Sequence, residues 1–303
     1  NTWLSWADFP PSILNGGSHY SDFTSYDWKD ATLWINQNTA NDAVIASWWD
    51  YGYWITTLSD RATLADNATL IDWQIKKLAY ILITTPENSW KILSSDYTED
   101  ISLYLGNETI LQFGGTLEDE FKKNYLEKHG VSCEQIFKLE SQNLGVPEES
   151  CNPITKGMDA DYLLIYLAGE RFYAEGVNIP LYMLEGGGDE SKKTWFTKIS
   201  NHQISKYIEN DNITPTKFYM ENTTLGMLTP FTIYKYVEPN TGRTFDTYEN
   251  GLVPVYINDL KFKDPETDPF YLVYASPSFY SQDTGPMSTV LIYKINHDYI
   301  PQN

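Results

Sequence analysis

The spacing of hydrophobic positions predicts several helices in the first two thirds of the chain. In "YDWKDATLWINQNT" the apolar residues recur at helical intervals, at Trp28, Ala31, Trp34 and Ile35. Further helices are predicted for "GYWITTLS", for "DNATLIDWQIKKLAYILIT" before Pro86, and for "ENSWKILSSD". After three consecutive glycines, "DESKKTWFTKISNHQISKYIEN" predicts one helix of several turns.

Short apolar runs predict buried strands between these helices, in "DAVIASW", "RATLA" and "DADYLLIYLAG". From about residue 231 the pattern becomes that of strands separated by turn residues, in "FTIYKYVEP", "LVPVYINDLKF", "FYLVYASPSF" and "STVLIYKIN". We therefore predict a mixed α/β core with mainly helical surroundings, followed by a β-rich C-terminal part. The core would span residues 1–230, with an acidic insertion at about 97–157, and the β-rich segment 231–303 would pack on it.

Composition narrows the possible partners. The 303 residues carry a net charge of −20, which argues against nucleic acid as a partner because binding it requires clustered Lys and Arg.

The two cysteines, Cys133 and Cys151, would form a disulfide in an oxidising compartment and remain free thiols in the cytosol. Runs such as "LAYILI" are too short to span a bilayer. The chain starts abruptly without Met, as expected for a piece of a longer protein.

The most unusual stretch is "IASWWDYGYWITTL", where Trp48, Trp49 and Asp50 are consecutive. Two indole N–H donors and one carboxylate acceptor would satisfy a hydroxyl group completely. Consecutive strand residues point to alternate faces, so these three can converge only if the strand ends and bends here. Alternatively, Asp50 caps the following helix and the tryptophans belong to the core. Composition and spacing alone favour this second interpretation.

A resemblance carried by the motif favours the first interpretation, in which the three residues bind a hydroxyl group. "SWWDYGYWI" resembles the WWDYG signature of the catalytic subunit of oligosaccharyltransferase, the enzyme of asparagine-linked protein glycosylation. The stretch "WINQNTANDAVIASWWDYGYWITTLSDRATLADNATL" is similar to the archaeal members, of the AglB type. "ENTTLGMLTPFTIYKY" and "STVLIYKIN" also resemble the family, so that the likeness covers nearly the whole chain except residues 97–157.

The resemblance implies a role in acceptor recognition. Trp48, Trp49 and Asp50 would bind the Ser or Thr hydroxyl of the acceptor sequon Asn-X-Ser/Thr, and Tyr51 and Gly52 would support the motif. A multi-pass membrane domain would precede this domain, which would lie on the extracytoplasmic face of the cell membrane. The full-length glycosyltransferase would take its glycan from a lipid-linked oligosaccharide donor, while this chain alone would be inactive.

The resemblance also implies a divalent metal, Mn or Mg, in the full-length enzyme. In the family the metal's carboxylate ligands lie mostly in the membrane domain. We therefore expect neither a catalytic residue nor a metal ligand in this chain.

A second motif of the family, D-x-x-K-x-x-x-M or I, is matched imperfectly by "DESKKTWF". Asp189 and Lys192 occupy the first two places, and Phe196 stands where the family has Met or Ile. The resemblance implies that all three contribute to acceptor binding, with the methyl contact at Phe196 in question. From the residues alone, Asp189 could simply cap a helix, Lys192 and Lys193 could be solvated, and Phe196 could be core.

Two other classes of function fit the composition. A carbohydrate-binding module would use the abundant aromatic residues, 15% of the chain, to stack on sugars. A surface-layer structural domain would explain the acidity. The first would bind free glycans, and the second would tolerate substitution of Asp50.

Overall fold

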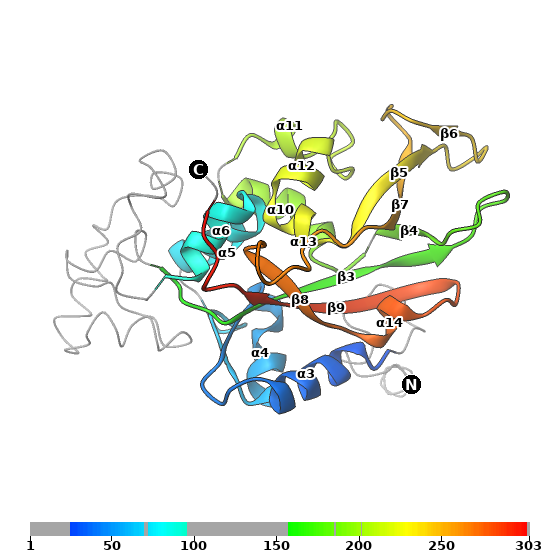
Figure 1. The fold of residues 1–303 in the computed structure, drawn as a ribbon. Helices are drawn as coiled ribbons and strands as arrows, with labels where there is room; N and C mark the ends of the chain where they lie inside the picture. The colour runs from blue at the N-terminus through cyan, green and yellow to red at the C-terminus, as the bar shows by residue number, and fades with distance from the viewer. Residues whose placement is uncertain (1–24, 70–71, 96–156, 185, 201, 302–303) are drawn as a thin grey trace, which may run out of the picture.

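The computed structural model describes residues 25–69, 72–95, 157–184, 186–200 and 202–301. Within these ranges one mixed sheet of nine strands organises the chain (Figure 1). The strands are β1 (Val44–Ala46), β2 (Ala62–Thr63), β3 (Tyr162–Phe172), β4 (Leu181–Leu184), β5 (Phe231–Val237), β6 (Thr244–Phe245), β7 (Val253–Asn258), β8 (Phe270–Ala275) and β9 (Gly285–Ile295). The predicted class, a mixed α/β core with a β-rich C-terminal part, is confirmed.

Strand β3 lies at the centre of the sheet. It pairs antiparallel with β9 along nearly its whole length, from Tyr162 opposite Lys294 to Arg171 opposite Gly285. On its other edge, β1 runs parallel to its start and β4 antiparallel to its end. Its side chains are buried on both faces over most of the strand, which explains the almost unbroken apolar run in the sequence. Strands from before and after residue 230 thus share one sheet.

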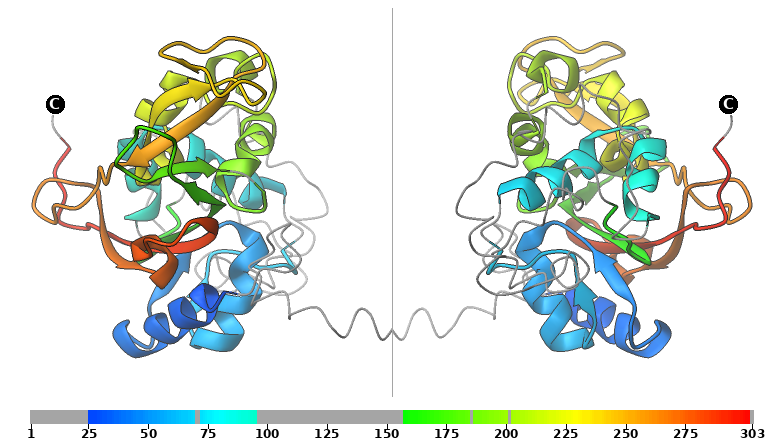
Figure 2. Two further views of the ribbon diagram at one scale, coloured as in Figure 1. Left: turned by 90° about the vertical axis from the view of Figure 1, so that its right-hand side faces the viewer. Right: turned by 90° about the vertical axis from the view of Figure 1, so that its left-hand side faces the viewer.

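Helices lie on both sides of the β3–β9 pair (Figures 1 and 2). On one side are α3 (Asp27–Asn38), α4 (Gly52–Trp54) and a π-helical turn at Ile55–Ser59, and α3 packs against this turn and β9. On the other side are α5 (Asp72–Ile83), α6 (Pro86–Leu93), α10 (Lys193–Ile199), α11 (Ile204–Tyr207), α12 (Lys217–Asn222) and α13 (Thr224–Leu228). The short helix α14 (Pro277–Tyr280) connects β8 to β9.

Most elements appear where the hydrophobic pattern places them, but the helix predicted from residue 189 is wrong in its length. It is a 3-10 turn, η4 (Glu190–Lys192), followed by the separate helices α10 and α11. Helix α10 ends at Ile199, where His202 bonds to backbone carbonyls of the last turn. The backbone N–H of His202 donates to the Thr197 carbonyl, 3.0 Å away, and its ring Nδ1 lies 2.9 Å from the Ser200 carbonyl.

Predictions that concern residues 96–156 fall outside the described residues. These are the acidic insertion and the pairing of Cys133 with Cys151. In the part of the chain that the structure describes, no helix has the length and apolarity needed to cross a membrane.

Candidate functional site

The chain bends sharply at the tryptophan pair. Strand β1 ends at Ala46, Trp48 keeps an extended backbone, and the 3-10 turn η1 (Trp49–Tyr51) begins immediately after it. This turn continues into α4 and then into the π-helical turn, which ends at Asp60 in a left-handed conformation. The predicted end of the strand is confirmed. Asp50 lies inside the turn rather than at its N-cap, so the capping interpretation of Asp50 is wrong.

Gly52 allows this bend to pack against the loop after β2. A Cβ atom at position 52 would lie 2.2 Å from the carbonyl oxygen of Ala65 and 2.6 Å from the Cα of Asp66. Both neighbours are backbone atoms, which cannot move aside as a flexible side chain can. Glycine is therefore required here by the close approach of two backbone segments, and its φ is that of an ordinary helix.

Arg61 holds the end of the π-helical turn through hydrogen bonds to backbone carbonyls. Its buried guanidinium donates hydrogen bonds to the carbonyls of Asn36 and Thr39, at the end of α3, and to those of Ser59 and Asp60. One cation therefore satisfies carbonyl groups at the ends of two helical segments. This contact holds the segment that follows the tryptophan pair against α3.

The two tryptophans differ in burial. Trp48 is only 2% exposed and meets the ring of Phe196 edge to face, with ring centroids 4.7 Å apart. Trp49 is half-buried, and its ring lies 6.0 Å from that of Trp48. Among the residues that the structure describes, neither indole N–H donates a hydrogen bond. The pair therefore offers two donors that the described protein groups leave unused.

Asp50 meets the second motif directly. Its Oδ2 atom lies 2.7 Å from the Lys192 ammonium, and the two side chains are 36% and 22% exposed. The same ammonium donates to the Tyr51 hydroxyl at 2.9 Å and lies 4.6 Å from the centre of the Tyr51 ring. The structure thus brings together the predicted residues Asp50 and Lys192, with Tyr51 between their two elements.

Asp189 lies behind this contact and is completely buried. One carboxylate oxygen accepts from the Tyr51 hydroxyl and the other from the backbone N–H of Tyr166, each at 2.9 Å. Burial raises the pKa of Asp189 to about 6, although the Lys192 ammonium, 4.0 Å away, acts in the opposite direction. Asp189 occupies the N-cap position of η4, but its side chain makes no capping bond and instead bonds to Tyr51 and Tyr166.

Tyr51 connects the two motifs. Burial and the neighbouring Asp189 carboxylate raise its pKa well above the usual value, so the phenol stays protonated. It can therefore donate to Asp189 while accepting from Lys192. Its ring also packs in a cluster with Trp28 and Tyr166. The sequence analysis assigned Tyr51 only to supporting the motif, and Tyr166 to a strand without a role at the site.

The other residues of the second motif point inward. Phe196 has no exposed surface, so its visible contact is with Trp48 rather than with solvent. Lys193 is 3% exposed and lies 2.7 Å from the Glu190 carboxylate. The interpretation of Lys193 as a solvated charge is therefore wrong. In the described part of the chain, no group of three or more His, Cys, Asp or Glu side chains is placed to hold a metal ion.

The part of the chain that carries the Trp48–Gly52 motif is similar to known proteins. Residues 41–142 match the family described as "STT3/PglB/AglB core domain". The chain is 34% identical over 148 residues to the dolichyl-diphosphooligosaccharide–protein glycosyltransferase subunit STT3 of Dictyostelium discoideum, covering 45% of this chain and 19% of that protein. It is 30% identical over 110 residues to the subunit of the same name in Saccharomyces cerevisiae, covering 36% and 15%. The chain thus spans less than a fifth of the length of these relatives.

Among solved structures, the chain is similar to the C-terminal globular domain of an oligosaccharyltransferase from Archaeoglobus fulgidus. The identity is 15%, the match covers 78% of this chain and 99% of that one, and the TM-score is 0.29. The family match at residues 41–142 includes the whole Trp48–Gly52 motif and Arg61. Over residues 41–142 the chain is therefore similar to the STT3/PglB/AglB core domain.

Proposed function

We propose that this chain forms the acceptor-recognition domain of an oligosaccharyltransferase, and that it binds the Ser or Thr hydroxyl of an Asn-X-Ser/Thr sequon. The observation that carries the proposal is the pair of indole N–H donors of Trp48 and Trp49, which no described group uses, directly before Asp50 in the chain. A hydroxyl has one hydrogen to donate and two lone pairs to accept. The three side chains match that requirement without any further group.

Lys192 occupies one carboxylate oxygen of Asp50 and leaves the other available to an acceptor hydroxyl. Its ammonium bonds to Oδ2 of Asp50, and no described residue donates to the Oδ1 atom. The ion pair orients the carboxylate, while Oδ1 accepts the hydrogen of the acceptor hydroxyl. Tyr51 and Asp189 hold the ammonium from behind, so Asp189 acts through Lys192 rather than by touching the peptide.

Phe196 takes part indirectly in this proposal. Because it is completely buried against Trp48, it sets the position of the indole and does not itself contact the sequon. The threonine methyl group would instead meet the half-buried ring of Trp49. This assigns the recognition surface to Trp48, Trp49, Asp50 and Lys192, with Tyr51, Gly52, Asp189 and Phe196 positioning them.

The whole protein, in this proposal, is a multi-pass membrane glycosyltransferase that carries this domain on its extracytoplasmic face. It would transfer a lipid-linked oligosaccharide to the asparagine of an acceptor protein. The relatives are named as subunits of a dolichyl-diphosphooligosaccharide–protein glycosyltransferase. The described residues do not fit a divalent metal such as Mn or Mg, because they hold no suitable cluster of ligands. In this proposal the metal is held by residues outside the described ranges.

Glycan transfer by the full-length enzyme tests the proposal. Matched peptides containing Asn-Ala-Thr, Asn-Ala-Ser and Asn-Ala-Val would be offered with a competent lipid-linked donor. A site built to hydrogen-bond a hydroxyl rejects an analogue without it by about 10⁴-fold, so Thr and Ser peptides should be modified and the Val peptide should not. Equal modification of the Val and Thr peptides would contradict the proposal. Binding of free glycans without any transfer would instead favour a carbohydrate-binding module.

A further inference from the structure

The turn that carries Lys192 contains a second ion pair that faces away from the site. Asp189 and Lys192 lie 4.0 Å apart, and Glu190 and Lys193 lie 2.7 Å apart. Both pairs join residues three positions apart, and the second is displaced from the first by a single residue. The Lys192 side chain is 22% exposed, whereas the side chains of Glu190 and Lys193 are 5% and 3% exposed.

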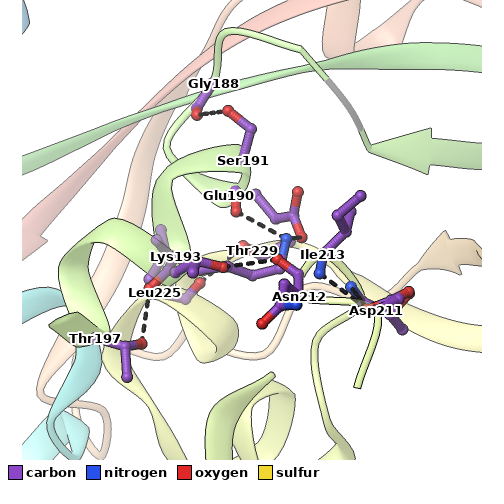
Figure 3. Close-up of polar contacts among 12 residues, drawn as sticks. Gly188, Glu190, Ser191, Lys193, Thr197, Asp211, Asn212, Ile213, Leu225 and Thr229 are labelled. Atoms are coloured by element: carbon purple, nitrogen blue, oxygen red, sulfur yellow. Dashed lines mark hydrogen bonds and ion pairs between the residues drawn. The ribbon is translucent and has the colours of Figure 1, made fainter. Parts of the chain in front are cut away.

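The buried pair is part of a dense set of bonds within the turn (Figure 3). The Lys193 ammonium also donates to the backbone carbonyl of Glu190 at 3.2 Å, and the Thr197 hydroxyl donates to the carbonyl of Lys193 at 2.7 Å. The Ser191 hydroxyl donates to the Gly188 carbonyl at 2.7 Å. Figure 3 shows the Glu190 and Lys193 side chains pointing toward one another. The ion pair thus spans the junction between η4 and α10.

The charge of Glu190 acts on two buried tyrosines. Tyr219 of α12 and Tyr256 of β7 are completely buried nearby, and the pKa of each is raised well above its usual value by burial first and then by the Glu190 carboxylate. The Tyr219 hydroxyl has no hydrogen-bond partner. A buried ion pair generally stabilises a fold no better than apolar side chains of similar size. Stability alone therefore gives little reason for charges at positions 190 and 193.

The sequence of the turn suggests what the charges accomplish. In "DESKK", two adjacent acids precede Ser191 and two adjacent lysines follow it. If the turn shifted by one residue, Glu190 would lie where Asp189 lies, and Lys193 would lie where Lys192 lies. In the observed register, Asp189 accepts from the Tyr166 N–H, and Lys192 reaches Asp50. In this register Glu190 and Lys193 form the buried pair, while Lys192 stays partly exposed. A polar pair of this kind can specify one arrangement among similar ones.

We propose that Glu190 and Lys193 are positioning residues of the acceptor site, which fix the rotation of the turn so that Lys192 meets Asp50. The inference rests on the proposed function, because it names what orients the recognition side chains. Neither residue touches the acceptor. Their loss should weaken acceptor binding equally in the ground state and the transition state, and should leave donor binding unchanged.

Transfer kinetics of the full-length enzyme test this role. In the double variant Glu190→Gln/Lys193→Met, both charges are removed together, so that no buried charge remains unpaired. We expect the KM for an Asn-Ala-Thr peptide to rise about tenfold or more, with kcat and the donor KM changed by less than about twofold. Arg171→Met is the matched control, because Arg171 is a buried cation at the other end of β3 that donates to the carbonyls of Ser278 and Asp283.

Two further measurements separate the possible outcomes. Asp50→Ala is assayed in parallel, and normal transfer by that variant would overturn the proposed function itself. If Asp50→Ala is defective but the double variant has the same acceptor KM as Arg171→Met, only the positioning role fails. The single variant Glu190→Gln leaves the buried Lys193 ammonium without its counter-charge, and is expected to lower the stability of the enzyme more than the double variant does. If neither variant yields folded enzyme, the pair serves the stability of the fold, and the inference is wrong.

Discussion

The Lys192 ammonium lies 2.7 Å from the Asp50 carboxylate, although the two residues are 142 positions apart in the sequence. This contact joins the turn after β1 to the turn before α10. Behind it, the Tyr51 hydroxyl accepts from Lys192 and donates to the buried Asp189. The two motifs therefore form one hydrogen-bonded unit, and substitutions within it should have effects that depend on one another.

Tyr51→Phe should destabilise the domain by about 1–3 kcal/mol, because it removes a hydrogen bond from a buried carboxylate and keeps the ring. Asp189 would lose the donor to its Oδ1 atom, and Lys192 would lose one of its acceptors. Denaturant unfolding of wild type and variant measures the difference. The control is Tyr166→Phe, which removes only a 3.3 Å contact with the Ser288 hydroxyl. Equal effects of the two substitutions would show that the Tyr51 hydroxyl contributes nothing specific.

The free energy of unfolding should depend on pH because of the raised pKa of Asp189. Burial raises its pKa from 3.8 to about 6 in the folded state, so the folded state binds more protons than the unfolded state between these two values. Stability should therefore fall as the pH rises from about 4 to about 6 and then level off, by roughly 3 kcal/mol for two pKa units.

Subtracting the unfolding free energy of Asp189→Asn from that of the wild type isolates this contribution, since other titrating groups cancel. The difference should decrease with rising pH across this interval and be constant above about pH 7. A difference that increases with pH would mean that the Asp189 pKa is depressed, and that the carboxylate is stabilised by its hydrogen bonds more than it is penalised by burial.

Gly52→Ala should be strongly destabilising, by about 3 kcal/mol or more, because its Cβ would overlap the backbone at Ala65 and Asp66. Gly176→Ala provides the comparison. Gly176 has a positive φ of 78°, but a Cβ atom added there would meet no neighbouring atom within 4 Å, so that only backbone strain of about 1 kcal/mol is expected. Thermal unfolding of both variants separates overlap from strain. A Gly52→Ala variant as stable as Gly176→Ala would show that the loop after β2 can move away from the motif.

Local pattern predicted much of the fold. The helix at Asp27–Asn38 follows from its apolar spacing, and β3 and β9 follow from long apolar runs. The break after Ile199 was not predicted, because it depends on His202 bonding back to the preceding turn. Strand β4 is only four residues long and has no alternation that would distinguish it from a loop.

At the site, sequence identified the two motifs but not how they meet. The Asp50–Lys192 contact depends on the placement of β1 and β3 side by side in the sheet, which no local pattern contains. Glu190 and Lys193 resemble a solvated pair on a helix surface, and only the tertiary structure shows that their side chains are buried. The importance of Tyr51 follows from the same tertiary contacts.

A thermodynamic cycle tests whether Asp50 accepts a hydrogen bond from the sequon hydroxyl. The Kd of Asn-Ala-Thr and Asn-Ala-Val peptides is measured for the full-length wild type and for Asp50→Ala. Asp42→Ala is the control, since Asp42 is an exposed carboxylate near the same strand. We expect the wild type and Asp42→Ala to prefer the Thr peptide, and Asp50→Ala to lose about 1.5–3 kcal/mol of this preference. An unchanged preference in Asp50→Ala would show that Asp50 does not bind the hydroxyl.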